Sequence, residues 1–176
     1  MSRHAFVDES YRREYVLCAV IVDSDKVRET RRLVAGMLRG NQRRIHMSKE
    51  SRASRKLIVE RVSLLHIEAT TVSTRTAGRS RRSARNVALT NLTDVLRKSG
   101  VTRVVIESCD QDAEDRQVIG DRLAKRGEVR SMDVYHLRPS EDPLLWLPDI
   151  VAWVAGNSDP IWAEAKQALL IAAYLA

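Results

Sequence analysis

Residues 14–22 have the sequence Glu-Tyr-Val-Leu-Cys-Ala-Val-Ile-Val, a nearly unbroken run of apolar and β-branched side chains. A strand with one face in water alternates apolar and polar residues, and this segment does not alternate. It is therefore predicted to be a central strand that is buried on both faces of a sheet. Residues 4–8, His-Ala-Phe-Val-Asp, form a shorter strand before it, and residues 9–13 have the length of a hairpin connection.

Strands and helices alternate along the rest of the chain. Further strands are predicted over residues 66–75, 101–107 and 132–137. Helices are predicted from the cap at 23–25 to Gly40, and over 50–64, 80–98, 113–126, 143–155 and 159–174. This order predicts an α/β fold with a mixed five-stranded sheet and helices on both faces.

The composition favours one folded domain over residues 1–176. Hydrophobic residues make up 44% of the chain, and its 7 glycines and 4 prolines exclude a low-complexity protein. No run approaches the roughly 20 apolar residues that span a bilayer, and Asp8 interrupts the first apolar run before a signal peptide could form. We therefore expect a cytoplasmic protein with no membrane partner.

Two cysteines, Cys18 and Cys109, occur in apolar runs without the Cys-x-x-Cys spacing of metal or redox motifs. A reduced cysteine in such a run behaves as a small hydrophobic residue. Both cysteines are therefore predicted to be buried thiols that form neither a disulfide nor a zinc site.

The chain carries a formal net charge of +7, and lysine occurs only at positions 26, 49, 56, 98, 125 and 166, so arginine dominates. Arginine pairs bidentately with phosphate, which makes nucleic acid a candidate partner. The alternative is that the arginines reflect a GC-rich genome and only decorate solvated faces. The predicted nucleic-acid contacts lie in a basic loop and at a helix start: Arg43, Arg44, Lys49, Arg81, Arg82 and Arg85. For Lys49, a solvated helix start is the alternative.

Three carboxylates occupy positions where a charge is costly. Asp8 and Glu107 each end an apolar strand run, and Asp149 lies in the most apolar helix. A buried carboxylate needs a cationic partner, or its pKa rises until it is neutral. Several acids that converge without arginines between them form a hard-cation site. Taken singly, Asp8 could be a turn former, Glu107 could pair with Arg103, and Asp149 could lie in the first turn of a helix.

Four segments, in order, resemble an RNase H-like group of proteins known as domain of unknown function 3800. Asp8-Glu9-Ser10 is similar to its Asp-Glu-Ser-Gly opening, and Ile45-His46-Met47 to its His-bearing segment. Val104-Val105-Ile106-Glu107 resembles its acidic fourth strand, and residues 145–152 its closing helix. The chain departs from the pattern at Tyr11, which replaces the glycine, and at Trp146 and Pro148 before the last acid.

The resemblance implies an RNase H-like fold and a two-metal phosphodiesterase site holding Mg²⁺ or Mn²⁺. Asp8 would bridge both ions, Glu107 and Asp149 would each complete one coordination shell, and Asp110 could be a further ligand. Glu9 points to the opposite strand face and is not expected to be a ligand. His46 could orient water or protonate the leaving group, or it could be an ordinary loop histidine.

The sequence thus predicts a divalent-metal-dependent nuclease with catalytic residues Asp8, Glu107, Asp149 and His46. The alternative is a catalytically inactive RNase H-like domain that binds nucleic acid or acts as a scaffold, with its acids paired to arginines. The apolar residues 168–176 at the end of the last predicted helix either pack on the sheet or form a homodimer interface.

Overall fold

The computed structural model describes residues 2–11, 14–169 and 172–176. Its strands form one sheet in the order β5-β4-β1-β2-β3-β6. They are β1 (Arg3–Tyr11), β2 (Tyr15–Asp23), β3 (Glu68–Thr74), β4 (Val101–Glu107), β5 (Asp133–Leu137) and β6 (Ala172–Leu175). Strand β2 is antiparallel to both β1 and β3, whereas β4, β5 and β6 run parallel to their neighbours. The predicted mixed α/β sheet is confirmed, but it has six strands and not five.

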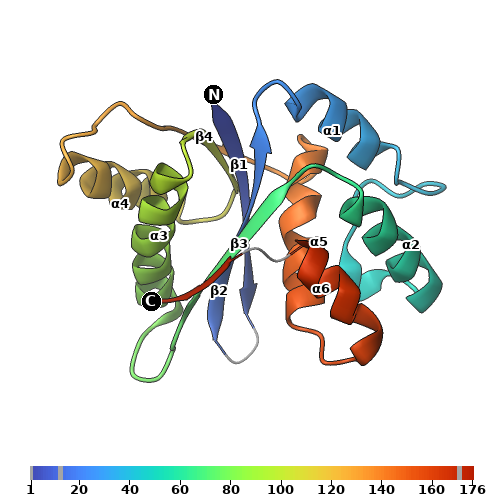
Figure 1. The fold of residues 1–176 in the computed structure, drawn as a ribbon. Coiled ribbons are helices and arrows are strands. Elements are labelled where there is room, and N and C mark those ends of the chain that lie inside the picture. The colour runs from blue at the N-terminus through green and yellow to red at the C-terminus, as the bar shows by residue number, and fades with distance from the viewer. Residues whose placement is uncertain (1, 12–13, 170–171) are drawn as a thin grey trace.

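Helices cover both faces of this sheet (Figure 1). They are α1 (Val27–Ala35), α2 (Arg52–Ser63), α3 (Arg81–Lys98), α4 (Asp112–Ala124), α5 (Trp146–Ala155) and α6 (Ala163–Leu169), with short 3-10 turns at 47–49, 143–145 and 160–162. Helices α3 and α4 lie on one face, and the other four lie on the opposite face. Each face has its own cluster of buried apolar side chains.

The period-two alternation of β1 assigns its side chains to these two clusters. Phe6 packs in the cluster under α5, and Val7 packs in the cluster under α3. Asp8 follows Phe6 by two residues, so its side chain lies on the α5 face, while Glu9 follows Val7 onto the α3 face. The two neighbouring acids of the opening strand therefore serve opposite faces of the sheet.

Helix α5 begins later than the sequence predicts. Residues 143–145 form a 3-10 turn, and the α-helix starts at Trp146. Pro148 then falls within the first turn, where a missing backbone N–H breaks no intrahelical hydrogen bond. Asp149 also lies in this first turn, where the helix dipole stabilises a carboxylate.

The last predicted helix, 159–174, is confirmed over Ala163–Leu169 and is wrong over residues 172–174. Helix α6 ends at Leu169, and Ala172–Leu175 pairs in parallel with β3. Residues 170–171 of that prediction lie outside the described residues. Alanine and leucine favour a helix locally, but the open edge of β3 offers this segment backbone hydrogen bonds, such as Ala176 N–H to the Ser73 carbonyl at 2.8 Å. Strand pairing therefore overrides local helix propensity at this position.

Other boundaries move by a few residues. Helix α1 ends at Ala35, short of the predicted end at Gly40. Strand β1 continues to Tyr11, which pairs with Tyr15, so residues 9–11 belong to the strand and not to the predicted connection over 9–13. Residues 12–13 lie outside the described residues. Among the helices of the described residues, none combines the length and apolar character needed to cross a membrane.

A buried ion network joins α3, α4 and the sheet on the α3 face. The Arg85 guanidinium donates to both carboxylate oxygens of Asp115, at 2.8 and 2.7 Å, and to Glu9 at 2.8 Å. The hydroxyl of Tyr15 and the imidazole of His136 complete the network. Arg85 is 2% exposed and Asp115 is fully buried, so each charge depends on the other for its stabilisation.

Asp115→Ala is expected to lower the free energy of unfolding by about 3–5 kcal/mol, because it leaves the Arg85 guanidinium buried without its bidentate partner. Urea denaturation measures this loss. Arg82→Ala removes another ion pair between α3 and α4, with Glu114, but the Arg82 side chain is 61% exposed. This control should cost no more than about 1 kcal/mol. Equal losses in the two variants would contradict a special role for the buried network.

Candidate functional site

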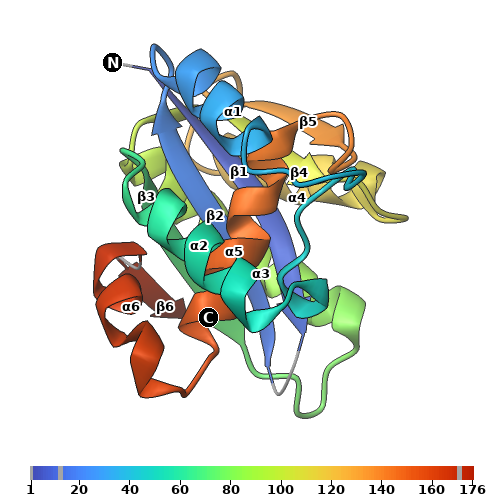
Figure 2. The same cartoon turned by 90° about the vertical axis from the view of Figure 1, so that its right-hand side faces the viewer.

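Three carboxylates from three elements face the α5 side of the sheet. Asp8 lies on β1, Glu107 is the last residue of the neighbouring parallel strand β4, and Asp149 lies in the first turn of α5. Glu107 follows Val105, which packs in the cluster under α5, so its side chain shares the face of Asp8. Helix α5 lies across β1 and β2 and brings Asp149 to these strands (Figure 2).

The Asp8 carboxyl is held among like charges. Burial, together with the negative charges of Glu107 and Asp149, raises its pKa from an ordinary 3.8 to about 8, against the opposing effect of the Glu9 backbone N–H. That N–H donates to Asp8 Oδ1 at 2.7 Å. Burial also raises the pKa of Glu107, although Arg44 and a hydrogen bond with Asp8 oppose the shift. Asp8 and Glu107 therefore behave as a pair that competes for one proton.

Asp149 is held by the segment that precedes α2. The Met47 backbone N–H donates to Asp149 Oδ2 at 2.9 Å, and His46 Nδ1 lies 3.2 Å from the same oxygen. His46 Nε2 lies 3.0 Å from the Ser48 hydroxyl. Met47 is fully buried in the cluster under α5 and anchors this segment. The structure thus places His46 beside Asp149. The sequence predicts His46 as a site residue but does not predict this contact.

Arg44 is the arginine that faces Glu107. Its Nη1 lies 3.9 Å from Glu107 Oε1. The alternative partner Arg103 stacks instead on the ring of Tyr135, at 5.1 Å from its centroid. At 3.9 Å, with the Arg44 side chain 44% exposed, this pair offsets the local negative charge only in part.

A polar cavity of about 70 Å³ opens where β1 and β4 separate. Asp8 and Glu107 line it from one face, and Arg85 and Cys109 are also on its wall. The remaining lining residues are Glu9, Leu17, Ile106 and Ser108. Its volume exceeds that of one water molecule, and its walls supply several hydrogen-bonding groups. The cavity can therefore hold ordered water.

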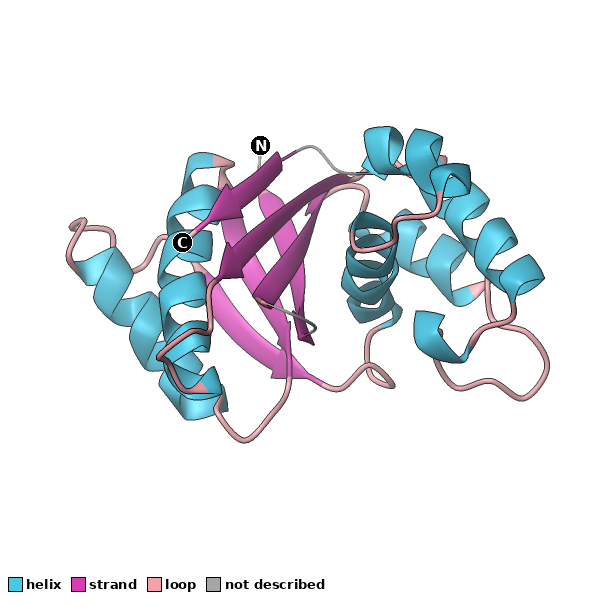
Figure 3. Ribbon diagram, turned by 90° about the horizontal axis from the view of Figure 1, so that it is seen from below, coloured by secondary structure: helices cyan, strands magenta, loops and turns pink. Residues whose placement is uncertain are grey.

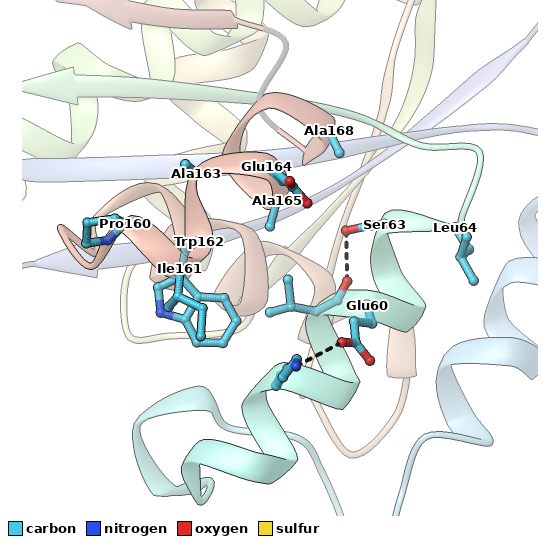
Figure 4. A pocket seen from close by; sticks show the side chains of 12 residues that line it. Glu60, Ser63, Leu64, Pro160, Ile161, Trp162, Ala163, Glu164, Ala165 and Ala168 are labelled. Carbon is cyan, nitrogen blue, oxygen red and sulfur yellow. Dashed lines mark hydrogen bonds and ion pairs between the residues drawn. The ribbon is translucent and has the colours of Figure 1, made fainter.

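A larger groove of about 870 Å³ lies between α2 and the segment 160–168 (Figure 4). It shares no lining residue with the polar cavity at Asp8 and Glu107. Lys56 and Glu60 on its wall form an ion pair at 3.9 Å. It is therefore separate from the site formed by the three acids.

A second cluster of possible metal ligands lies at the start of α4. Among the described residues, ligand atoms of Cys109, Asp112 and Asp115 come within 4.8 Å of one another, and those of Asp8, Glu107 and Asp149 do not form such a group. Both Asp115 oxygens already bind Arg85, and Asp112 accepts hydrogen bonds from the Ser108 hydroxyl and the Cys109 N–H.

Cys109 corrects one expectation: it is exposed, because it follows β4 and does not belong to it, whereas Cys18 is buried as predicted. Hydrophobic periodicity gives no indication of the cluster around Cys109. The spacing of Cys109, Asp112 and Asp115 at the start of a predicted helix was the available signal.

Two other acids do not belong to this set of three. Asp110 is exposed and lines an adjoining cavity with Arg81 and Arg82, and it is not among the residues that line the cavity at Asp8 and Glu107. Glu9 lies on the α3 face, as expected, where it pairs with Arg81 and Arg85. Neither Asp110 nor Glu9 is therefore counted with the candidate ligands Asp8, Glu107 and Asp149.

The basic residues divide into two groups. Arg43, Arg44 and Lys49 are exposed on the segment that carries His46. The arginines at the start of α3 have carboxylate partners within the fold: Arg81 with Glu9, Arg82 with Glu114, and Arg85 with Asp115. These pairs offset positive charge at a helix N-terminus without any phosphate. Arg85 is buried with occupied donors, which argues against its predicted contact with nucleic acid.

No family model matches the sequence, and no curated protein matches it. Solved structures do match the fold. One of them is the structure of the PCNA:RNase HII complex from Archaeoglobus fulgidus, with a TM-score of 0.53 and 16% sequence identity over 94% of this chain and 77% of that chain. The chain has an RNase H-like fold.

In metal-free protein, the free energy of unfolding is expected to fall as the pH rises from about 4 to about 8. In that window the folded protein holds a proton on Asp8 that the unfolded chain releases. Asp8→Asn removes this group and should flatten most of the slope, as measured by chemical denaturation across the window. Asp25→Asn, at an exposed position, should keep the wild-type slope. Identical slopes in wild type and Asp8→Asn would contradict the crowding of the acids.

Proposed function

We propose that this protein is a divalent-metal-dependent nuclease that hydrolyses phosphodiester bonds of nucleic acid, as its resemblance to domain of unknown function 3800 implies. The observation that carries the proposal is the surroundings of Asp8. The charged groups that most affect its pKa, Glu107, Asp149 and Glu9, are all acids. A fold gains no stability from such crowding in the absence of a cation.

The donor chemistry of the three acids fits a hard cation. Asp8, Glu107 and Asp149 offer carboxylate oxygens, which Mg²⁺ and Mn²⁺ prefer as ligands. They would hold the metal, and Asp110 lies outside this set. Bound there, the metal would supply a water of lowered pKa and stabilise negative charge on the phosphate oxygens. The likeness in fold to RNase HII supports a nucleic-acid substrate.

Residues around the acids would orient the substrate. His46 is 35% exposed, and its contacts with Asp149 and Ser48 fix the plane of its ring. It can therefore exchange a proton with a substrate group that lies beside Asp149. Arg44 is exposed beside Glu107 and can leave this long contact for a phosphate. Arg43 and Lys49, on the same segment, extend the positive surface.

One observation favours a second candidate function, an inactive RNase H-like domain that binds nucleic acid or acts as a scaffold. Two of the three acids already have cationic or potentially cationic neighbours: Arg44 at Glu107 and His46 at Asp149. In that case the acids would hold the segment 44–47 against the sheet. The two functions differ in their response to metal.

Mn²⁺ is expected to raise the melting temperature of the wild type, because it binds the folded state through acids that repel one another without it. Asp149→Asn should reduce cleavage of labelled RNA, DNA or RNA–DNA hybrid by about two orders of magnitude or more, because the ligand loses its charge. It should also remove most of the thermal shift. Asn keeps an oxygen for the Met47 N–H, so the metal-free variant should remain folded.

Asp112→Asn is the matched control, since it alters the cluster around Cys109 and leaves the three acids intact. It should keep both the Mn²⁺ shift and the cleavage. If Asp112→Asn abolishes the Mn²⁺-induced rise in melting temperature and Asp149→Asn does not, the ion binds at Cys109, Asp112 and Asp115, and the proposed site is contradicted. A wild type that cleaves none of the substrates and gains no stability from Mn²⁺ would support the inactive alternative.

Binding of a labelled duplex should weaken steeply as salt rises, with a log–log slope of about −0.9 for each phosphate contacted on duplex DNA. The double variant Arg43→Glu/Lys49→Glu should bind more weakly and show a shallower slope, as measured by fluorescence anisotropy without metal. Lys125→Glu/Arg130→Glu changes the net charge equally at exposed positions between α4 and β5. Equal losses in both double variants would mean that binding depends only on net charge.

A further inference from the structure

Strand β6 forms one edge of the sheet. Among the described strands it pairs only with β3, and β5 forms the opposite edge. Figure 3 shows the strand that ends at the C-terminus along the outer side of the sheet. An edge strand presents unpaired backbone groups that can pair with another chain.

The register of β6 identifies these groups. Tyr174 lies beside Val72, and the N–H of Ala176 donates to the Ser73 carbonyl at 2.8 Å. Backbone groups of alternate residues point to opposite sides of a strand. Ala176 and Tyr174 therefore point their backbone groups toward β3, and Ala173 and Leu175 point theirs outward.

The side chains of β6 do not protect this edge. Its sequence, Ala-Ala-Tyr-Leu, has no charge and no proline, and Tyr174 and Leu175 are 46% and 63% exposed. Proteins usually blunt an edge with charges, proline or a bulge. Strand β5 follows that rule: Asp133 is exposed on it, and Arg103 covers the ring of Tyr135.

We propose that a second copy of this chain pairs with β6 in the antiparallel direction about a two-fold axis. In the register that the outward groups allow, Ala173 faces Leu175 of the second copy and exchanges two backbone hydrogen bonds with it, and the symmetric pair exchanges two more. Tyr174 then faces Tyr174 of the second copy. Side chains are closest in such a non-hydrogen-bonded pair, and two aromatic rings stabilise it.

Charge opposes a second copy least at this edge. The chain carries a net charge of +7, so two copies repel each other wherever basic surfaces meet. The β6 edge has no charged residue, and its antiparallel copy places no like charges opposite each other. A four-residue pairing is smaller than a standard interface, so we expect a weak dimer. The pairing does not depend on the proposed nuclease activity.

Sedimentation velocity from about 1 to about 200 µM tests the dimer, with melting curves to show that each variant folds. Tyr174→Lys and Tyr174→Glu each place two like charges opposite each other at the axis and should raise the dimer Kd by about tenfold or more. An equimolar mixture of the two variants should restore dimers, because lysine then faces glutamate. Tyr135→Lys, at an equally exposed tyrosine on the opposite edge, should sediment as the wild type does.

Recovery of dimers in the mixture supports the two-fold register, because a merely destabilised variant would not recover on mixing. A wild type that is monomeric at every concentration would overturn the proposal. Unchanged dimers in either Tyr174 variant alone, or a mixture that stays monomeric, would also overturn it.

Discussion

The crowding of Asp8 against Glu107 and Asp149 is the constraint on which the rest of the site depends. Two parallel strands and one helix are needed to bring these acids together, and each acid comes from a different element. Burial and like charge raise the pKa of Asp8 to about 8, so the fold holds the group against its ordinary preference for the charged form. Such an arrangement costs stability, which a protein recovers when a cation binds.

The two faces of the sheet handle charge in opposite ways. On the α3 face, Arg85 meets Asp115 and Glu9 in a buried network whose hydrogen bonds satisfy each charge. On the α5 face, Asp8 has acidic neighbours, and Arg44 approaches Glu107 only at 3.9 Å. The paired network satisfies its charges, whereas the charged groups that most affect the pKa of Asp8 are all acids. This asymmetry is the physical basis for assigning function to the α5 face.

Periodicity in the sequence was sufficient for the central strands, because burial on both faces excludes polar residues from Leu17–Val22 of β2 and Val104–Ile106 of β4. It was insufficient where tertiary pairing decides the structure. Residues 172–175 have helical propensity, yet they pair with β3. Arg85 belongs to a basic cluster at a helix start, which predicts a phosphate contact. Only the packing of α3 on α4 shows that its partner is Asp115. The contacts of His46 and Arg44 with the acids span about 60 to 100 residues of sequence, which no local pattern encodes.

Anomalous diffraction from a crystal soaked in Mn²⁺ is the sharpest test of a metal site at the three acids, because it locates the ion without requiring activity. We expect a peak between the carboxylates of Asp8, Glu107 and Asp149, with Arg44 displaced from Glu107. A peak at Cys109, Asp112 and Asp115 would contradict this site. The absence of a peak, with Arg44 still in contact with Glu107 and His46 with Asp149, would contradict it as well.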